Sequence, residues 1–401
     1  MLSEKSAATV RATLPAVGGA ISEISGLFYD RLFAAHPELL RDLFNRGNQA
    51  AGTQREALAG AIAHFATVLV EHPGQRPDAM LSRIAHKHAS LGISPGQYHI
   101  VQKHLFAAIA EVLGDAVTEE VAAAWDEVYW LMANALIAIE QRLYAERGVL
   151  TGDAWRPWEV AGKVRETEDV VSFRLRPADG LPLPDFGPGQ YVSVRVELPD
   201  GARQIRQYSL SGAPGGDTTR QITVKRERGL AGDPDGEVSA HLHDHVGEGA
   251  RVELSAPYGD IVLADDGGPL LLASAGIGCT PMLAMLHRLA GDGYAAPVTV
   301  VHGDRTPEHH AHAADHRALA EKLPGGSTHF WYEDLGTGAA PDDRAGRVDL
   351  SGVELPDGLR AYLCGPLPFM RAVRTQLLER GVPASAVHYE VFGPDLWLAR
   401  D

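Results

Sequence analysis

The chain has 401 residues, of which 45% are hydrophobic and 22% are charged. At about 150 residues per domain this length favours two or three domains, and we expect three. The composition is that of a globular protein and gives no reason to expect disorder. The formal net charge of −16 repels nucleic acid and anionic lipid. Because no long Lys/Arg run offsets this charge, we expect no binding of nucleic acid.

No stretch of the sequence approaches the about 18 consecutive apolar residues of a membrane-spanning helix. The first twenty residues scatter charged side chains among apolar ones, unlike a signal peptide. We therefore expect a cytoplasmic protein without stable membrane insertion, present as a monomer or a weak homo-oligomer. The two cysteines, Cys279 and Cys364, are too few for a disulfide scaffold or a thiolate metal site.

Residues 1–147 place apolar side chains at three- and four-residue spacing, with breaks at His36-Pro37 and Ser94-Pro95-Gly96. This pattern predicts an all-helical domain. The helical spacing stops at 148–155, which we interpret as a linker.

The two later parts of the chain have different patterns. Alternating runs such as 191–196 and 221–225 predict β-strands. From about residue 264, short apolar runs alternate with helical patterns such as 281–290 and 367–380, which is typical of an open parallel α/β sheet. The apolar runs lie at 270–273, 298–301 and 361–363.

One histidine lies in the apolar stripe of the helix expected around residues 81–91. Leu81, Ile84, His88 and Leu91 follow one another at i, i+3, i+7 and i+10 and therefore share a face. An inward imidazole can ligate haem iron, although a histidine on an apolar face is more often an ordinary hydrogen-bonded core residue.

The β-rich part contains an Arg-x-Tyr-Ser pattern, Arg206-Gln207-Tyr208-Ser209, shortly after Gln190-Tyr191-Val192. Arg206 offers a guanidinium fork for a phosphate, Tyr208 an aromatic face for isoalloxazine and Ser209 a hydroxyl for the flavin N5 region. The segment Gly236-Glu237-Val238-Ser239 follows, and we expect Ser239 to cap a short helix whose N–H groups hold a pyrophosphate. Each element has an ordinary alternative, a plain strand and a plain helix cap.

The α/β part carries two further motifs. Gly276-Ile277-Gly278-Cys279-Thr280-Pro281 follows the first predicted strand; its glycines allow close backbone approach, and Pro281 suits the first helical position, which needs no N–H donor. Cys364-Gly365-Pro366 ends a later strand, and Glu390 and Phe392 lie near the C-terminus. In this order and after Arg-x-Tyr-Ser, the two motifs are typical of relatives of ferredoxin reductase.

Over essentially its whole length the chain resembles the flavohaemoglobins, with the motifs in the same order. The resemblance implies that His88 is the proximal haem ligand, with Tyr98 and Glu140 behind it, and that Phe44 packs on the porphyrin. It also implies a distal pocket lined by Tyr29, Gln54 and Leu58. Each of these residues has an ordinary alternative as a core aromatic, a surface polar residue or a solvated charge.

For the other two parts, the resemblance implies cofactor contacts from both sets of motifs. The flavin contacts are Tyr191, Arg206, Gln207, Tyr208, Ser209, Gly236, Val238 and Ser239. The nicotinamide-coenzyme contacts are Gly276, Gly278, Thr280, Pro281, Cys364, Gly365 and Pro366. Phe392 would lie against the flavin ring and yield to nicotinamide, with Glu390 near the same site.

We therefore expect a multidomain protein: a globin at 1–147, an FAD-binding antiparallel β-barrel at 156–262 and an NAD(P)-binding α/β domain at 263–401. The expected cofactors are haem b, FAD and NADH or NADPH. The sequence does not decide between the two coenzymes, because Arg305 suits a 2′-phosphate while Asp304 suits a ribose hydroxyl.

The resemblance implies nitric oxide dioxygenation, in which NO and O₂ become nitrate at a haem re-reduced by NAD(P)H through FAD. The Tyr29 hydroxyl would donate to O₂ on the iron, and the Glu140 carboxylate would make the His88 imidazole a stronger ligand. With Gln54 and Tyr98, these are the catalytic residues we expect. A haem-dependent NAD(P)H oxidase or peroxide reductase remains an alternative; an O₂ carrier or gas sensor is disfavoured, because a carrier has no use for a hydride-accepting module.

The thiol chemistry of the two cysteines and the remaining histidine runs are not covered by the haem, flavin and nucleotide assignments above. The two cysteines are expected side by side and exposed at the nicotinamide crevice, where oxidation would affect hydride transfer; the alternative is a pair of inert, partly buried residues. The remaining histidine runs lack a third ligand at metal-site spacing, so we interpret them as surface residues. They are His241, His243, His245, His309, His310, His312 and His316.

Overall fold

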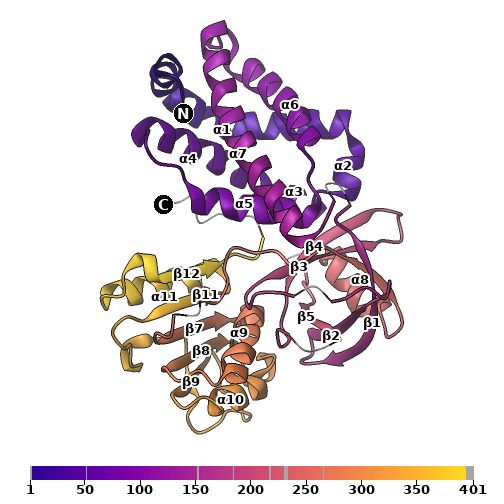
Figure 1. Cartoon of the computed structure of the whole chain (residues 1–401), viewed down its shortest axis with the longest axis vertical. Coiled ribbons are helices and arrows are strands. Elements are labelled where there is room, and N and C mark those ends of the chain that lie inside the picture. Colours follow the sequence, from indigo (N-terminus) through magenta and orange to yellow (C-terminus); the bar gives the residue numbers. More distant parts are fainter. Residues whose placement is uncertain are drawn as a thin grey trace. The chain divides into compact units, whose positions relative to one another are not determined.

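The computed structural model describes residues 2–50, 52–150, 153–183, 185–215, 218–229, 234–264 and 266–393. They form two compact units: residues 1–155 with 195–206 and 393–401, and residues 156–194 with 207–392. Figure 1 labels the elements of both units.

The first unit is built on helices, as the spacing of apolar residues predicts. The helices are α1 (Glu4–Ala35), α2 (Pro37–Asp42), α3 (Arg46–Ala50), α4 (Thr53–Glu71), α5 (Asp78–Leu91), α6 (Pro95–Leu113) and α7 (Glu119–Arg147). Helix α1 packs against α4, α6 and α7, and α5 packs against α7. Local signals set the ends of the helices: Ser94 and Gln97 form a capping box at the start of α6, and Gly148 ends α7 in the left-handed conformation.

None of the helices in the described residues combines the length and the apolar character that a membrane crossing requires. The expected cytoplasmic location stays a prediction.

The first sheet is antiparallel in its β1–β2, β1–β6 and β2–β5 pairs. Its strand order is β4-β3-β6-β1-β2-β5, and an isolated antiparallel bridge joins Leu210, just after β4, to Ile222 of β5. Closure of this kind satisfies edge strands that would otherwise be unpaired. The elements are β1 (Arg156–Arg165), β2 (Val170–Pro177), β3 (Tyr191–Glu197), β4 (Arg203–Ser209), β5 (Arg220–Lys225), helix α8 (Glu237–His245) and β6 (Arg251–Leu254).

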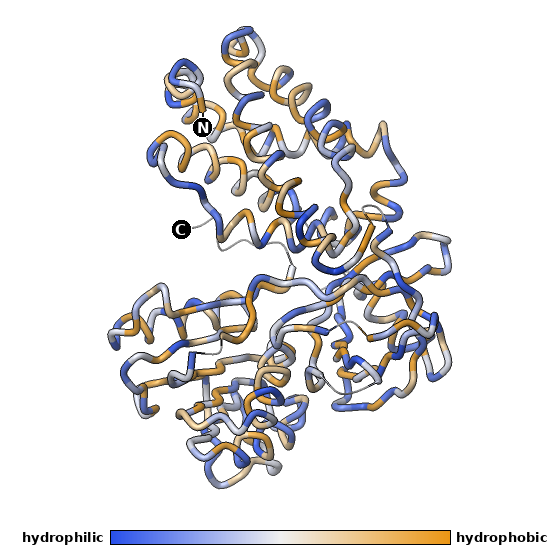
Figure 2. The backbone as a smooth tube through the Cα atoms, in the orientation of Figure 1, coloured by the Kyte–Doolittle hydropathy of each residue, from blue (hydrophilic) through white to orange (hydrophobic). Residues whose placement is uncertain are grey.

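The second sheet is parallel, in the order β10-β9-β8-β7-β11-β12. Its central strand is apolar on both faces and wholly buried from Leu270 to Ala273, as expected for a sheet covered by helices. Figure 2 shows orange, hydrophobic stretches in the strands of this sheet. The elements are β7 (Leu270–Ala275), α9 (Cys279–Asp292), β8 (Val298–Asp304), α10 (Ala313–Glu321), β9 (Gly326–Tyr332), β10 (Arg344–Ala345), β11 (Arg360–Cys364), α11 (Leu367–Glu379) and β12 (Val387–Glu390).

The interpretation of the histidine run as surface residues is wrong for three of its members. His310, His312 and His316 are 4%, 7% and 0% exposed. His310 stacks on His302 of β8 with ring centroids 3.7 Å apart, and its Nε2 lies 3.1 Å from Nδ1 of His316. Helix α10 begins only at Ala313, and residues 307–312 do not continue its helical register. Helical spacing therefore cannot predict which of these residues are buried.

Burial, together with neighbouring His302, holds the pKa of His310 well below its usual value and lowers the pKa of His316 from 6.5 to about 3. A neutral imidazole has apolar faces, one donor and one acceptor, so burial is tolerated only in this form. Half-buried His241 and His243 also depart from the surface interpretation, whereas His245 is exposed.

The burial of His316 predicts a specific pH dependence of stability. The unfolded chain binds a proton at this residue below pH 6.5, whereas the folded chain does not until about pH 3, so the free energy of unfolding falls as the pH drops through this window. Relative to wild type, His316→Gln should flatten this loss by up to about 1.4 kcal/mol per pH unit. Urea unfolding at a series of pH values measures the difference, with exposed His245→Gln as the control; parallel curves for wild type and His316→Gln would contradict it.

Candidate functional site

Three helices bring His88, Tyr98 and Glu140 together in the first unit. His88 lies near the end of α5, Tyr98 near the start of α6 and Glu140 in the second half of α7. The Nδ1 atom of His88 lies 2.8 Å from Oε1 of Glu140 and 2.9 Å from the hydroxyl of Tyr98, which donates to the same carboxylate oxygen. Sequence separations of 10, 42 and 52 residues are thus closed into one cluster.

The electrostatics of this cluster fix how His88 is presented. Glu140 is 2% exposed. Burial, and then the nearby Glu140 carboxylate, raises the pKa of Tyr98, so its phenol stays protonated and donates. With the carboxylate accepting from Nδ1–H, the other ring nitrogen of His88 keeps its lone pair for a metal.

The donor set fits a haem. In the part of the chain that the structure describes, no cluster of three or more His, Cys, Asp or Glu side chains could hold a bare metal ion. A single imidazole suffices for haem iron, because the porphyrin nitrogens supply the other ligands. The half-exposed His88 ring, with a carboxylate behind it, has the chemistry of such a ligand.

The expected distal residues also lie together. Tyr29 of α1 is buried, and its ring centroid lies 5.6 Å from that of Phe33 and 5.9 Å from that of Phe44. Burial raises the pKa of Tyr29 to about 12, a shift opposed mainly by a hydrogen bond with the side chain of Gln54 on α4. The Tyr29 hydroxyl is therefore protonated at neutral pH and can donate to a ligand. Leu58 lies one turn after Gln54 on α4 and is partly buried.

Gln49, which the sequence did not indicate, also lies at this place. It lies on the short helix α3, and its side chain approaches the Tyr29 hydroxyl. The two residues are 20 positions apart in the sequence, and a polar residue in a short connecting helix carries no local signal of such proximity.

A segment of the β3–β4 hairpin, residues 195–206, belongs to the same unit as the helices. The buried Gln204 amide donates to the carbonyl oxygen of Arg41 at 2.9 Å, and Arg46 pairs with Asp200 at 2.7 Å. Arg206 follows on the same strand, and its guanidinium donates to the Ile205 carbonyl oxygen at 2.7 Å. The end of α2 and the stretch before Arg206 are therefore tied by a buried amide.

The remaining flavin-motif residues lie at the end of β4 and beside it. Ser209 is buried, Tyr208 is partly buried, and the Gln207 amide donates to the Ser193 hydroxyl at 3.1 Å. Tyr191 begins the neighbouring strand β3 and is buried. The Arg-x-Tyr-Ser segment is therefore part of the antiparallel sheet.

The expectation that Ser239 caps α8 is wrong. The helix begins at Glu237 with Gly236 at the cap position, and the Ser239 hydroxyl instead donates to the Gly236 carbonyl oxygen at 3.0 Å and accepts from the Glu227 N–H at 3.1 Å. A Cβ at Gly236 would lie 2.8 Å from the Ser239 hydroxyl oxygen, so the close approach of the chain requires glycine. The N–H groups of the first turn of α8, which contains buried Val238, have no partner within the helix and therefore still suit a phosphate.

The two nucleotide motifs touch each other. Strands β7 and β11 pair in parallel, and a Cβ at Gly278 would lie only 2.3 Å from the carbonyl oxygen of Cys364. Gly276 has φ of 52°, a conformation that favours glycine. Gly365 and Pro366 continue from Cys364 into the start of α11, and buried Thr280 donates to the Ile277 carbonyl oxygen at 3.0 Å.

Pro281 is the third residue of α9, not the first as predicted, because the helix already begins at Cys279. The physical reason for accepting proline is unchanged, since no N–H group of the first helical turn has a partner within the helix.

Cys279 begins α9, directly after the loop that follows β7, and Cys364 ends the neighbouring strand β11, as predicted, but the expected exposure of their thiols is wrong. Both are wholly buried, and burial raises the pKa of each thiol. A thiol that stays protonated and out of solvent is a poor nucleophile. The structure therefore favours the alternative of two inert, buried side chains.

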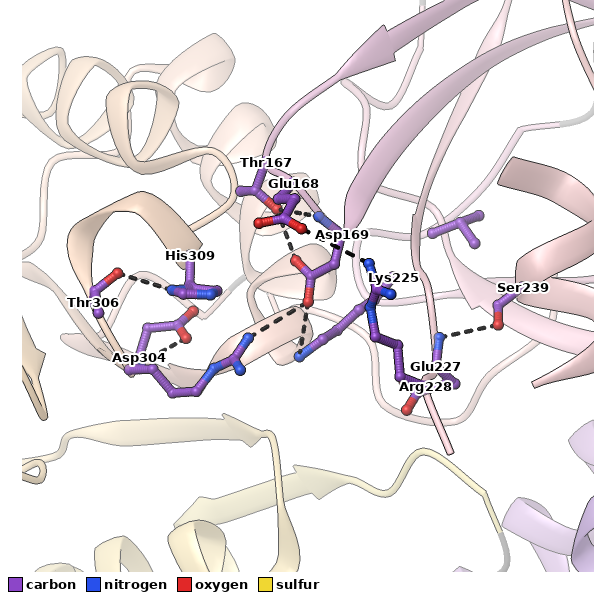
Figure 3. A network of polar contacts seen from close by, with 12 residues as sticks. Thr167, Glu168, Asp169, Lys225, Glu227, Arg228, Ser239, Asp304, Thr306 and His309 are labelled. Atoms are coloured by element: carbon purple, nitrogen blue, oxygen red, sulfur yellow. Dashed lines mark hydrogen bonds and ion pairs between the residues drawn. The ribbon is translucent and has the colours of Figure 1, made fainter. Parts of the chain in front are cut away.

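Asp304, the last residue of β8, and Arg305, which follows it, are the two residues relevant to the choice of coenzyme. Asp304 has a side chain only 8% exposed and accepts from the Arg305 N–H at 2.8 Å. The Arg305 side chain is 56% exposed and lies 3.5 Å from Asp169 of the antiparallel part, in the network of Figure 3. Glu390 is the last residue of the edge strand β12, where it pairs in register with Cys364 of β11. Phe392, two residues later, is 46% exposed.

Three family matches cover these parts in order. Residues 26–136 match the globin family, residues 157–263 match the oxidoreductase FAD-binding domain and residues 272–375 match the oxidoreductase NAD-binding domain.

Full-length relatives carry the same architecture. The chain is 43% identical over 408 residues to a flavohemoprotein of Bordetella parapertussis, covering 98% of this chain and 99% of the relative. It is 37% identical over 420 residues to a flavohemoprotein of Bacillus subtilis, covering all of both chains.

Solved structures agree. The crystal structure of a flavohemoglobin from Malassezia yamatoensis with bound FAD and heme matches with a TM-score of 0.89 at 37% identity, over 98% of this chain and all of that one. The FAD/NAD-binding domain of a Vibrio cholerae nitric oxide dioxygenase matches with a TM-score of 0.56 at 40% identity, over 60% of this chain and 99% of that one.

These relationships establish haem, FAD and a nicotinamide coenzyme as the cofactors of an NAD(P)H-dependent oxidoreductase. The His88 cluster has the chemistry to hold a haem, and the flavin motif 206–209 and the nucleotide motif 276–281 lie within the ranges that match the FAD-binding and NAD-binding domains. The chain therefore belongs to the flavohaemoglobin family.

Proposed function

We propose that this oxidoreductase is a nitric oxide dioxygenase, which combines NO and O₂ into nitrate at the haem. The observation that carries the proposal is the buried Glu140 carboxylate, which accepts a hydrogen bond from Nδ1 of His88. Tyr29 and Gln54 would serve the other, distal side of the haem. A carboxylate behind the ligating histidine increases its electron donation to iron, which favours activating O₂ over carrying it. The name of the Vibrio cholerae relative points the same way.

When bound, haem supplies the iron that holds O₂, and FAD accepts two electrons from the coenzyme and passes them on singly. The chain's own residues do the rest. Glu140 keeps the His88 proton on Nδ1, and Tyr98 satisfies the same carboxylate. On the distal side, the protonated Tyr29 hydroxyl donates toward the place where negative charge develops, and Gln54 orients that hydroxyl.

In the reductase part, we propose that Arg206 and the N-terminus of α8 hold the FAD phosphates, with Tyr208 and Ser209 at the ring. Gly276 and Gly278 would let the coenzyme approach the backbone, with Cys364 and Glu390 nearby and Phe392 covering the flavin. The domain boundaries of 147, 156 and 263 belong to the same proposal.

The direct test is the stoichiometry of the reaction. Each NO that joins O₂ as nitrate consumes one electron, so oxidation of one NAD(P)H should yield two nitrate ions. We expect this ratio when haem- and FAD-loaded protein receives NO, O₂ and NAD(P)H, with nitrate and coenzyme both measured. Coenzyme oxidation without nitrate would instead identify a haem-dependent oxidase or peroxide reductase and reject the proposal.

Tyr29→Phe tests the distal donor, because it keeps the ring and deletes only the hydroxyl. A charge-assisted hydrogen bond contributes about 1.5–3 kcal/mol, so its loss should speed O₂ dissociation roughly ten- to a hundredfold. NO turnover at limiting O₂ should fall in parallel, while flavin reduction by NAD(P)H should not change. Flash photolysis or rapid mixing measures the O₂ rate.

Tyr144→Phe is the matched control, because it removes a buried hydroxyl that donates to the Ile93 carbonyl oxygen in the same unit. Its O₂ dissociation rate should equal that of wild type. An unchanged O₂ rate in haem-loaded Tyr29→Phe would show that Tyr29 is a packing residue only.

The position of the flavin and nucleotide motifs predicts that a fragment from about residue 150 onward binds FAD and reduces an artificial acceptor with NAD(P)H. A comparable fragment of the Vibrio cholerae relative has been crystallised. Flavin absorbance and acceptor reduction measure both properties. A folded fragment without flavin would refute the assignment of the FAD site.

A further inference from the structure

One buried histidine has a backbone conformation that histidine rarely adopts. His312 has φ of 62° and ψ of 23°, and among the described residues it is the one non-glycine residue with positive φ. Its Cβ makes this left-handed region unfavourable, so such a backbone persists only where its surroundings hold it in place. The contacts of the His312 side chain therefore have to account for this backbone conformation.

Both ring nitrogens of His312 are engaged, on opposite sides. Nδ1 lies 3.1 Å from Oδ2 of Asp315, in the first turn of α10, and 3.6 Å from Oε2 of Glu166. Nε2 lies 3.1 Å from the hydroxyl of Thr223 on β5 and 3.4 Å from that of Ser172 on β2. With Nδ1–H donating to the carboxylate, Nε2 is the acceptor for the Thr223 hydroxyl. A single imidazole thus joins the α/β part of the second unit to its antiparallel sheet.

The hydroxyls that meet His312 continue toward the flavin motif. The Thr223 hydroxyl lies 2.9 Å from the hydroxyls of both Ser172 and Ser211, and all three side chains are buried. Ser211 is two residues after Ser209, the last residue of the Arg-x-Tyr-Ser segment. The buried hydrogen bonds therefore lead from the start of α10 to the strand end that carries the flavin-binding residues.

Another polar contact joins the same two parts at the rim. Asp169, in the turn between β1 and β2, lies 3.5 Å from the Arg305 guanidinium and 3.9 Å from the Lys225 ammonium, with the Thr167 hydroxyl at 2.9 Å (Figure 3). Arg305 is mostly exposed, and exposed ion pairs add little rigidity. Buried apolar contacts of Val170 with Cys279 and Ala311 lie next to His312. Among these contacts between the α/β part and the antiparallel sheet, the hydrogen bonds of His312 are thus the buried and directional ones.

We propose that His312 is a positioning residue for hydride transfer, which sets the place of the bound nicotinamide relative to the flavin. In this step the C4–H bond of the reduced nicotinamide breaks, and its hydrogen and both electrons form an N–H bond at flavin N5. The nicotinamide is oxidised and the flavin reduced by the same two electrons. The rate depends steeply on the separation of the reacting atoms, and a displacement of about 1 Å can cost a hundredfold. The proposal does not depend on NO being the substrate.

The test uses the full-length, FAD-loaded protein and NADH under anaerobic conditions. His312→Ala removes the ring and leaves the unfavourable backbone unsupported, whereas His312→Asn keeps an amide that can hydrogen-bond and a residue type that tolerates positive φ. We expect His312→Ala to slow flavin reduction at saturating NADH about tenfold or more, with the Kd for NADH changed less than threefold. His312→Asn should recover most of the rate.

A second variant removes the other end of the hydrogen bond. Thr223→Val has nearly the shape of threonine without its hydroxyl and should slow flavin reduction in the same direction. Combined with His312→Ala it should add little, because residues acting through one interaction are not additive. The flavin difference spectrum at saturating NAD⁺, which reports ring stacking without turnover, should be altered in His312→Ala and Thr223→Val and restored in His312→Asn.

His309→Ala is the matched control, because that ring bonds locally to the Thr306 hydroxyl at 2.8 Å. Its rate and difference spectrum should equal those of wild type. The proposal is rejected if FAD-loaded His312→Ala reduces its flavin at the wild-type rate. It is also rejected if the rate falls only in proportion to lost FAD, or if Thr223→Val leaves both rate and spectrum unchanged.

Discussion

A buried carboxylate on α7 is the constraint on which the candidate haem site depends. Removing Glu140 from water costs several kcal/mol unless donors replace the lost hydration. Its donors are the His88 ring and the Tyr98 hydroxyl, which come from α5 and α6. Satisfying one charge therefore fixes three helices relative to one another, and the same contacts decide which nitrogen of His88 keeps a lone pair that a metal can accept. The orientation of the His88 ring thus follows from the hydrogen bonds that satisfy a buried charge.

In the nucleotide-binding part, the corresponding constraint is steric. Gly278 meets the carbonyl oxygen of Cys364, and a Cβ there would lie 2.3 Å from that oxygen. In the antiparallel part, Gly189, with φ of 107°, meets the carbonyl oxygen of Ile261, and a Cβ there would also lie 2.3 Å from the oxygen. These glycines are required by contacts within the protein, before any coenzyme is considered. The glycines of the motif thus allow the loops that follow β7 and β11 to come close together. Because no side chain covers the backbone there, a phosphate can approach it.

Local patterns predicted the element types and the motifs, but not where helices begin or what lies behind them. Ser239 and Pro281 are both the third residue of their helices, because Glu237 and Cys279 start those helices earlier than the motifs suggest. Gln49 was missed because only the tertiary fold brings it to Tyr29. His310 and His316 were misread because their burial depends on His302 of β8, and no spacing within the run reports a contact with another strand.

His88 and His312 show the same use of an imidazole at two unrelated places. In each, a carboxylate holds the proton on Nδ1, Glu140 for one and Asp315 for the other, and Nε2 presents a lone pair to its partner. For His312 the carboxylate lies three residues away and the partner is the Thr223 hydroxyl, whereas for His88 the carboxylate lies 52 residues away and the proposed partner is haem iron. The resemblance to a known family pointed only to His88, because a family motif records the residues that touch a cofactor. The residues that hold two sheets at a working distance have to be found from their contacts.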